Sequence, residues 1–267
     1  MRTKTFNSTL FYIKSTEGMK NEVDMWHTGA LLFVLEVINK YYRFLKLGKY
    51  IGEELRKKLP TISVLDVCCG PGNFANYLSF YYPIDKLNVI GVDKNKQFLE
   101  YANKKFRVYG WRFVKADVRK FNLRRKFEFI IASSAYHHIE DKHKVKFLNR
   151  INNHLLPNGK IIVCENFLPS YTNKTSKIKA IRDYYSELRK YYLQGNGTPE
   201  ALSMVEHVYR LELSAKEEYK VSFKRFEKDI KKAGFQIVAD KIIWQPEKFK
   251  KDNAGSHVLL LKKANAE

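Results

Sequence analysis

The chain has 267 residues, of which 45% are hydrophobic and 14% aromatic, and this composition predicts a folded globular protein without long disordered stretches. Its apolar runs fall short of the roughly 18 residues that a membrane span needs, and no signal peptide is visible, so we expect a cytoplasmic protein with no membrane span. The three cysteines fit neither a disulfide framework nor a zinc-ligand spacing, so we expect reduced thiols and no metal site.

The formal net charge of +21 is compatible with binding to nucleic acid, because Lys and Arg neutralise phosphate groups. Lysine outnumbers arginine, however, and it is scattered over almost every predicted helix rather than gathered in one stripe. We therefore favour a solvated basic surface, with nucleic acid as the less favoured partner. The oligomeric state is not predicted.

Residues 1–60 are expected to form an arm and helices that pack on the core. The first 17 residues show no clear period. Apolar residues recur at helical spacing over 23–47, and Gly48 marks a stop. A second helix is predicted over 51–59, before Pro60.

A short apolar run then ends near Asp66 and passes through a glycine turn into a helical pattern. Gly70, Gly72 and Ala75 satisfy the Gly-x-Gly-x-x-Gly/Ala pattern of a nucleotide-binding loop, since glycine lets the backbone turn sharply and approach a ligand. Pro71 has no N–H for a phosphate oxygen, and Asp66 opposes a doubly charged pyrophosphate. The loop therefore favours a cationic ligand such as S-adenosylmethionine over NAD.

The stretch from Asp66 to Gly72 resembles the first motif of the class I S-adenosylmethionine-dependent methyltransferases, small-molecule type, with Cys68 where the family most often has its first glycine. The resemblance implies an α/β fold, a three-layer αβα sandwich with a mostly parallel seven-stranded sheet whose last strand is antiparallel. It also implies S-adenosylmethionine as cofactor. Residues 61–167 are the expected Rossmann-like core.

Two further acids follow predicted strands of this core. Asp93 ends the apolar run 87–93, about twenty residues beyond the glycines, where an acid accepts hydrogen bonds from ribose hydroxyls; the alternative is that it only caps the helix 95–105. Asp117 follows the strand 111–115, where the resemblance implies a contact with the adenine amino group, and a turn-forming role is the alternative. The expected cofactor contacts also include Lys94, Val118 and Ser133.

The fourth predicted strand, 127–133, is followed by Tyr136, His137 and His138, which resemble a histidine pair of small-molecule methyltransferases and are the candidate catalytic residues. Packing and capping are the alternative roles, with only a slight preference for catalysis. Neither the Asn/Asp-Pro-Pro-aromatic tetrad of amino-directed enzymes nor the Pro-Cys nucleophile of cytosine C5 enzymes is present, which disfavours two nucleic-acid chemistries.

A helix over 144–156, a turn over 157–159 and a fifth strand over 160–165 follow, and Glu165 points toward the expected substrate. Residues 168–221 are predicted to be an inserted helical substrate cap, with a helix over 176–193 and a second one capped by Thr198. Its candidate substrate residues are Arg182, Tyr184 and Tyr185, although packing on the core is the more common role of such tyrosines. Residues 222–267 are expected to complete the sheet with a helix capped by Ser222 and two strands, 236–244 and 257–262.

These features predict an enzyme that methylates a small molecule under the helical cap. An RNA methyltransferase that uses the basic surface is the first alternative, and a non-catalytic protein that binds S-adenosylmethionine is the second. A nicotinamide dehydrogenase ranks last because of Pro71 and Asp66. Neither the acceptor nor the kind of atom that is methylated follows from the sequence.

Overall fold

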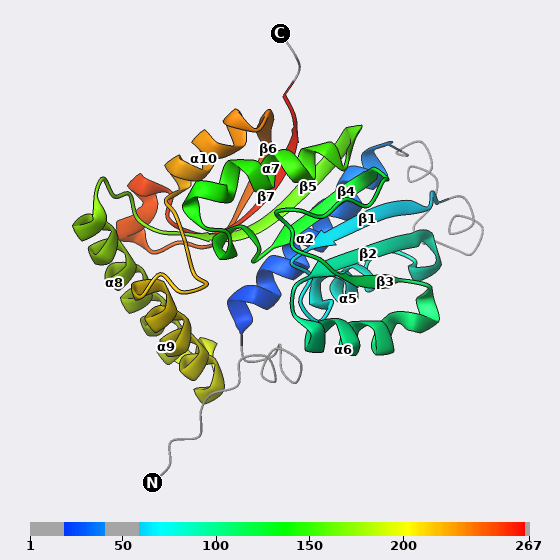
Figure 1. Ribbon diagram of the computed structural model, residues 1–267. Coiled ribbons are helices and arrows are strands. Elements are labelled where there is room, and N and C mark those ends of the chain that lie inside the picture. The colour runs from blue at the N-terminus through cyan, green and yellow to red at the C-terminus, as the bar shows by residue number, and fades with distance from the viewer. Residues whose placement is uncertain (1–18, 41–58, 265–267) are drawn as a thin grey trace.

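The computed structural model describes residues 19–40 and 59–264 (Figure 1). The predicted N-terminal arm, the end of the first predicted helix and nearly all of the second lie outside these residues. The helix that is described at this end, α2, spans Lys20–Lys40. No described helix is both long enough and apolar enough to cross a membrane.

A seven-stranded sheet forms the centre of the fold, in the order β3-β2-β1-β4-β5-β7-β6. The strands are β1 (Ile62–Val67), β2 (Leu87–Asp93), β3 (Arg112–Lys115), β4 (Phe127–Ser133), β5 (Leu155–Phe167), β6 (Phe235–Trp244) and β7 (Gly255–Lys263). The strands β1 to β5 pair in parallel, and β7 runs antiparallel between β5 and β6. The predicted fold class is confirmed.

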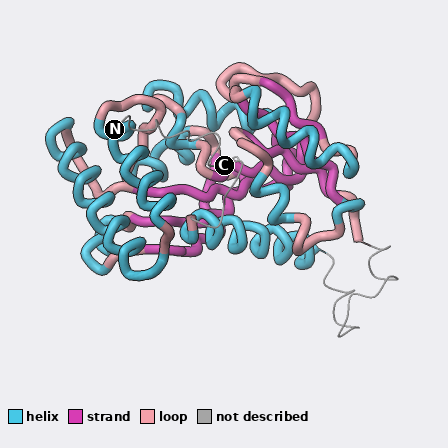
Figure 2. Tube along the Cα trace, turned by 90° about the horizontal axis from the view of Figure 1, so that it is seen from below, coloured by secondary structure: helices cyan, strands magenta, loops and turns pink. Residues whose placement is uncertain are grey.

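Helices cover both faces of this sheet, as Figure 2 shows in a view turned by 90°. One face carries α2, α5 (Asn73–Leu78) and α6 (Lys96–Phe106), and the other carries α7 (Lys144–Asn153) and α10 (Phe223–Lys232). Neighbouring strand residues face opposite sides, so Val64 of β1 belongs to the first core and Leu65 to the second. The chain order reverses between β1 and β4, the place where open α/β sheets bind ligands.

The helices α8 (Lys174–Tyr191) and α9 (Pro199–Leu213) pack against each other beside the sheet and share a third apolar core. Thr198 caps α9 by accepting a hydrogen bond from the Ala201 N–H, and Pro199 is its first residue, as predicted. Between the helices Gly195 has a φ of +88°, which breaks the helical path.

The chain departs from the predicted elements at the start of β5. This strand begins at Leu155 rather than at residue 160, and α7 ends at Asn153 rather than at 156. Phe127 pairs with Leu155 and Phe129 pairs with Lys160, so residues 156–159 bulge out of the ladder. The predicted turn is therefore an irregularity inside one strand.

Candidate functional site

The glycine loop lies between β1 and α5 and contains three residues with left-handed backbone. Their φ angles are +55° at Cys68, +52° at Gly70 and +83° at Gly72. The two glycines have different surroundings. A Cβ at Gly70 would meet no atom of the described residues within 4 Å, whereas one at Gly72 would lie 2.7 Å from the Phe106 ring. Gly70 thus faces open space in which a ligand can lie, and Gly72 allows the loop to pack on α6.

Asp93 closes this loop from the end of β2. Its Oδ2 accepts a hydrogen bond from the Gly70 N–H at 2.9 Å, and its Oδ1 accepts one from the Asn95 N–H at 2.8 Å. The side chain that caps α6 belongs to Asn95, which accepts from the N–H groups of Gln97 and Phe98. The capping role considered for Asp93 therefore falls to Asn95, and Asp93 is bound to the glycine loop itself.

Asp66 places a buried carboxyl group at the same loop. Its side chain is only 2% exposed, and its Oδ2 has no hydrogen-bond partner within the described part of the chain. Burial, and secondarily the carboxylate of Asp93, raise the pKa of Asp66 well above its usual range. A buried acceptor without a donor beside an open glycine is suited to a cationic ligand.

Cys68 lies among these acids. Burial raises the pKa of its thiol, and the carboxylates of Asp93 and Asp66 add to this effect. The thiol is therefore protonated at neutral pH. All three cysteines of the chain are free, as predicted.

The other predicted cofactor residues lie around this edge in different settings. Arg119 donates to both carboxylate oxygens of Asp117, at 2.9 and 2.7 Å, and holds the pKa of that carboxyl at about 2. Val118 is buried in the core, Lys94 is exposed and pairs with Glu217 at 3.5 Å, and the Ser133 hydroxyl accepts a hydrogen bond from Trp26. The arginine competes with any adenine amino group for Asp117.

His137 is buried at the end of β4 and is held by Glu165 at the end of β5. Its Nδ1 lies 2.5 Å from Glu165 Oε1, and its backbone N–H donates to Glu165 Oε2 at 3.2 Å. Burial opposes a charge on the ring, but the carboxylates of Glu165 and Glu218 outweigh it and raise the pKa of His137. The raised pKa of His137 favours a pair of imidazolium and carboxylate, and Glu165 orients this histidine.

His138 has the opposite electrostatic setting. Its Nδ1 lies 2.8 Å from the backbone carbonyl of Glu217, and since a carbonyl only accepts, Nδ1 carries the proton and Nε2 is the free base. Partial burial and the charged His137, whose ring centroid is 4.2 Å away, lower the pKa of His138. Its side chain is 41% exposed.

Residues 214–221, which return from α9 to the core and are called here the return segment, form one wall of this site. The Tyr219 N–H donates to the His137 carbonyl at 2.7 Å. Glu218 lies 3.7 Å from His137 Nε2 and pairs with Lys220 at 2.5 Å, and Lys220 also reaches Glu212 at 3.4 Å. These charges are buried together, which lowers the pKa of Glu218 to about 2 despite its burial.

Ligand atoms of His137, His138 and Glu218 lie within 4.8 Å of one another, a grouping of a size that accepts a metal ion. The Lys220 ammonium already neutralises Glu218 there. A divalent ion would have to bind beside this fixed positive charge, which is why the predicted lack of a metal site is retained as a prediction.

Tyr136 does not join the histidines. Its ring is buried against Phe226, and its hydroxyl donates to Asp229 of α10 at 2.8 Å. The Lys144 ammonium binds its backbone carbonyl at 2.8 Å. The hydroxyl is thus bound to a buried carboxylate on the face of the sheet that α7 and α10 cover, and the catalytic role of Tyr136 stays a prediction.

The predicted substrate residues of α8 also differ from one another. Tyr184 and Tyr185 are buried in the core shared by α8 and α9, which is the packing role considered above, and Arg182 is exposed. The Tyr185 hydroxyl has no hydrogen-bond partner among the described residues. Contact of these residues with a substrate stays a prediction.

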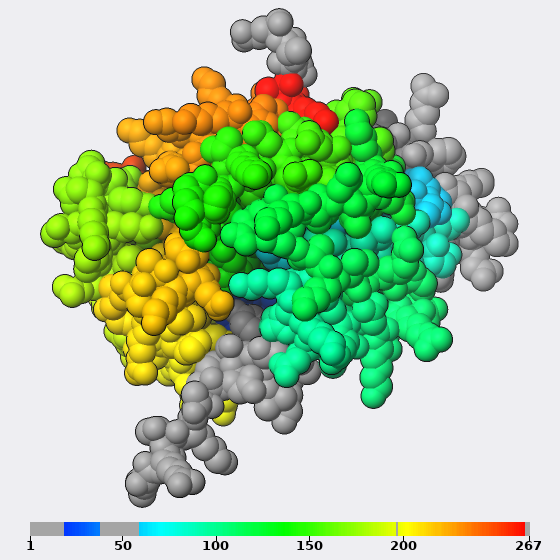
Figure 3. All heavy atoms as spheres, viewed as in Figure 1, coloured from blue at the N-terminus to red at the C-terminus, as the bar shows by residue number. Residues whose placement is uncertain are grey.

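Sequence reasoning missed Glu22 and the charges of the return segment. Glu22, in the first turn of α2, accepts from the Ser134 hydroxyl at 2.9 Å, so this helix starts over the end of β4. Glu218 and Lys220 are two residues apart, and this alternation of acid and base before Ser222 was the available signal. In Figure 3 the surface is hollowed between α9, in yellow, and the teal residues that follow β2.

Comparisons with known proteins agree with this geometry. A family model described as a methyltransferase domain matches residues 64–159. The chain is 33% identical over 124 residues to a malonyl-[acyl-carrier protein] O-methyltransferase of Legionella pneumophila, an alignment that covers 42% of this chain and 42% of the relative. The chain thus spans less than half of that relative's length.

Two solved structures share the fold. PKMT2 from Rickettsia typhi in complex with AdoHcy has a TM-score of 0.52 at 21% identity, covering 78% of this chain and 49% of that chain. An S-adenosylmethionine-dependent methyltransferase from Clostridium acetobutylicum has a TM-score of 0.50 at 17% identity, covering 79% and 87%. Residues 64–159 thus form a methyltransferase domain, the fold is that of the S-adenosylmethionine-dependent methyltransferases, and S-adenosylmethionine is the cofactor of such enzymes.

The residues present fit this cofactor. The orphaned buried oxygen of Asp66 suits its ammonium group, and the open side of Gly70 leaves room for the methionine portion. Asp93 lies at the end of β2, and its contact with the ribose hydroxyls stays a prediction. When bound, the cofactor supplies an electrophilic methyl group at the C-terminal edge of the sheet.

Proposed function

We propose that the protein transfers a methyl group from S-adenosylmethionine to an oxygen atom of a small molecule, with His138 as the general base. The proposal also assigns α8, α9 and the return segment to a cap that holds the acceptor. The observation that carries it is the tautomer of His138, whose Nδ1 is bound to the Glu217 carbonyl and whose Nε2 is free at the end of β4.

Methyl transfer from a sulfonium is an in-line displacement in which the acceptor oxygen forms a bond to carbon as the sulfur–carbon bond breaks. Most of the rate then comes from positioning, and a base is needed when the oxygen carries a proton. His138 Nε2 takes that proton. The lowered pKa of His138 keeps this nitrogen unprotonated at neutral pH.

His137 is a positioning residue in this account. Its buried contact with Glu165 fixes the ring beside His138, and its positive charge disfavours a second imidazolium 4.2 Å away. Glu165 and Glu218 flank that charge, and Lys220 balances them. The four groups hold the base in place without themselves touching the reacting atoms.

An oxygen acceptor is also supported by the Legionella relative, which is named as an O-methyltransferase. Its name refers to a malonyl group on a carrier protein, and that substrate belongs to the relative. For this chain the supported class is an oxygen nucleophile small enough to fit between the cap and the histidines.

A panel assay tests the proposal. S-Adenosylmethionine labelled in its methyl group is incubated with hydroxyl, carboxyl, thiol and amine acceptors, and with total RNA. Transfer to a hydroxyl compound that is lost in His138→Ala supports the proposal. Transfer to RNA alone favours the nucleic-acid alternative, and cofactor binding without transfer to any acceptor favours a non-catalytic protein.

A further inference from the structure

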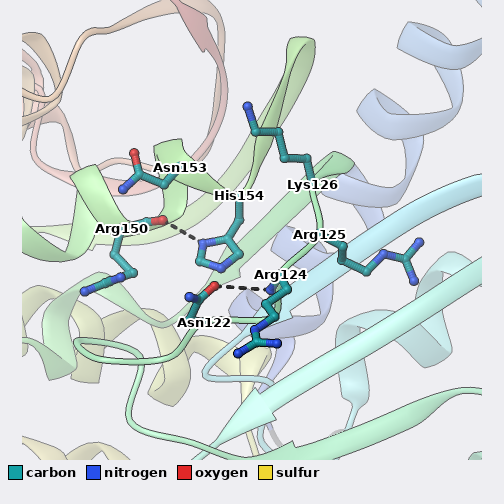
Figure 4. Close-up of a pocket in the computed structure, with 7 residues that line it drawn as sticks. All are labelled: Asn122, Arg124, Arg125, Lys126, Arg150, Asn153 and His154. Carbon is teal, nitrogen blue, oxygen red and sulfur yellow. Dashed lines mark hydrogen bonds between the residues drawn. The ribbon is translucent and has the colours of Figure 1, made fainter.

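A second polar site lies at the opposite edge of the sheet. Seven residues line a hollow of about 370 Å³ there: Asn122, Arg124, Arg125, Lys126, Arg150, Asn153 and His154 (Figure 4). They come from the loop before β4 and from the end of α7, whereas the histidine pair follows β4. A strand of seven residues is about 20 Å long, so the hollow is separate from the site of methyl transfer.

The hollow is built around a fixed histidine. His154 is 4% exposed, its Nδ1 donates to the Arg150 carbonyl at 2.9 Å, and its Nε2 accepts from the Leu123 N–H at 3.3 Å. Its ring stacks on Phe121 with centroids 4.5 Å apart. Both ring nitrogens take part in hydrogen bonds that connect the loop to α7. The His154 ring therefore has no nitrogen left to bind a ligand.

Arg124 lies in a turn of the loop before β4. Arg124 has a φ of +48°, and its backbone N–H donates to the Asn122 side chain at 3.2 Å. In Figure 4 the Arg124 and Arg150 side chains lie to either side of Asn122, below His154, while Arg125 and Lys126 point away from them. Arg124, Arg150 and Asn122 all line the same hollow.

The charge of this hollow is uncompensated. Four of its lining residues are Arg or Lys and none is acidic, and within the described ranges none of the four cations forms an ion pair with a carboxylate. The carbonyls at the end of α7 favour a cation and account for Arg150, but not for the three consecutive cations of the loop. Burial, and secondarily the charge of Lys126, lower the pKa of Lys263.

We propose that this hollow binds a phosphate group, held between Arg124 and Arg150 with the Asn122 amide as a further donor. Guanidinium forks match phosphate oxygens in pairs, and no aromatic ring other than the committed His154 lines the space for a base to stack on. The recognition is thus of phosphate rather than of a base. The phosphate comes either from a nucleic-acid backbone or from a phosphorylated small molecule.

Two paired variants of the full chain test this. Arg124→Asn with Arg150→Gln removes both forks, and Asn tolerates the left-handed backbone at 124. Arg107→Gln with Arg112→Gln removes two exposed guanidiniums near β3 and is the matched control. Thermal unfolding and binding of S-adenosylmethionine, measured on both, should equal the wild type, which separates this site from the cofactor site.

The probes are a labelled 20-nucleotide single-stranded RNA, pyrophosphate and poly-L-glutamate, each titrated between 50 and 200 mM salt. We expect Arg124→Asn/Arg150→Gln to weaken binding of RNA or pyrophosphate at least tenfold, and the control less than twofold. For RNA the slope of log affinity against log salt should fall by about 0.7, since one phosphate contact is lost. Binding of RNA without pyrophosphate identifies a nucleic-acid source, and pyrophosphate as tight as RNA identifies a small molecule.

Three results would overturn the proposal. The first is an equal loss in both double variants, which shows diffuse charge rather than a site. The second is poly-L-glutamate bound as tightly as either phosphate probe, which removes the preference for phosphate. The third is wild-type protein that binds neither phosphate probe at the lowest salt.

Discussion

His138 Nδ1 donates to the backbone carbonyl of Glu217 at 2.8 Å, and this single contact sets the chemistry of the histidine pair. It joins the end of β4 to the return segment from α9, and it leaves Nε2 of His138 as the free base. His137, one residue earlier, is bound to Glu165 instead, and its pKa is raised. The pKa values of the two adjacent histidines are thereby shifted in opposite directions.

Replacement of His138, the proposed base, should slow methyl transfer without weakening cofactor binding. In His138→Ala we expect kcat to fall by about 10²–10⁴, the usual contribution of a general base, with the Kd for S-adenosylmethionine within twofold of wild type. His143→Ala, at the next turn, is the matched control and should keep kcat. A His138→Ala enzyme with wild-type kcat would remove this residue from the mechanism.

The pH–rate profile should report the same group. Partial burial and the charge on His137 lower the pKa of His138 from 6.5, and a base acts only when unprotonated. Therefore kcat should be level above pH 6.5 and fall below it, with an apparent pKa under 6.5. A rate that keeps rising through pH 8 would point to another base.

Replacement of Asp66 should stabilise the folded protein but weaken its binding of S-adenosylmethionine. Its pKa is higher in the folded chain than its ordinary value of 3.8, so its charge opposes folding, and this loss grows as the pH rises from 3.8 through the folded pKa. Asp66→Asn should raise the free energy of unfolding at pH 7 by about 1–3 kcal/mol without cofactor, while weakening S-adenosylmethionine binding. Chemical denaturation at pH 4 and pH 7, with calorimetry, measures both.

The matched control for that variant is Asp93→Ala. Asp93 accepts from two backbone N–H groups, so its loss should lower the free energy of unfolding by about 1–3 kcal/mol. If both substitutions stabilised the protein, or both destabilised it, the conclusion that a buried charge on Asp66 opposes folding would be contradicted.

Replacement of Cys68 by glycine, the residue that the family most often has at this position, should stabilise the folded protein. With a φ of +55° it occupies a backbone region that strains a side chain, and relief of that strain exceeds the entropic cost of glycine. Cys68→Gly should therefore raise stability by about 1 kcal/mol, seen as a higher Tm. Cys69→Gly, at a buried neighbour without positive φ, should lower it. The reverse order of Tm values would refute the strain argument.

Metal removal should leave activity unchanged. The grouping of His137, His138 and Glu218 has the right size for an ion, but the Lys220 ammonium lies 2.5 Å from Glu218 and repels a second cation. Dialysis against EDTA should therefore not alter kcat. Loss of activity that Zn²⁺ restores would show a metal centre at these residues.

Much of the fold could be predicted because its signals are local. The apolar runs before Asp66 and Asp93 mark the strands, and Thr198 and Ser222 cap helices by contacts three residues away, within the reach of a sequence pattern. The bulge at the start of β5 was not predicted, since a Pro-Asn-Gly segment favours a turn until its neighbour strand fixes the register.

The partners of the site residues could not be predicted in the same way. Glu165 and His137 are 28 residues apart, and Tyr136 and Asp229 are 93 apart. The sequence spacing indicates only that such side chains lie at the same edge of the sheet or in the same core. Which of them pair depends on how elements that are far apart in the sequence pack together. The pairs of Glu165 with His137 and of Tyr136 with Asp229 were therefore not predicted.

Calorimetry of S-adenosylmethionine binding tests the central claim most directly, because every later step depends on the loop that Asp93 closes. The account predicts binding by the wild type, tighter than any binding of NAD, and loss of that binding in Asp93→Ala. Preference for NAD, or an Asp93→Ala protein with wild-type affinity for S-adenosylmethionine, would contradict it.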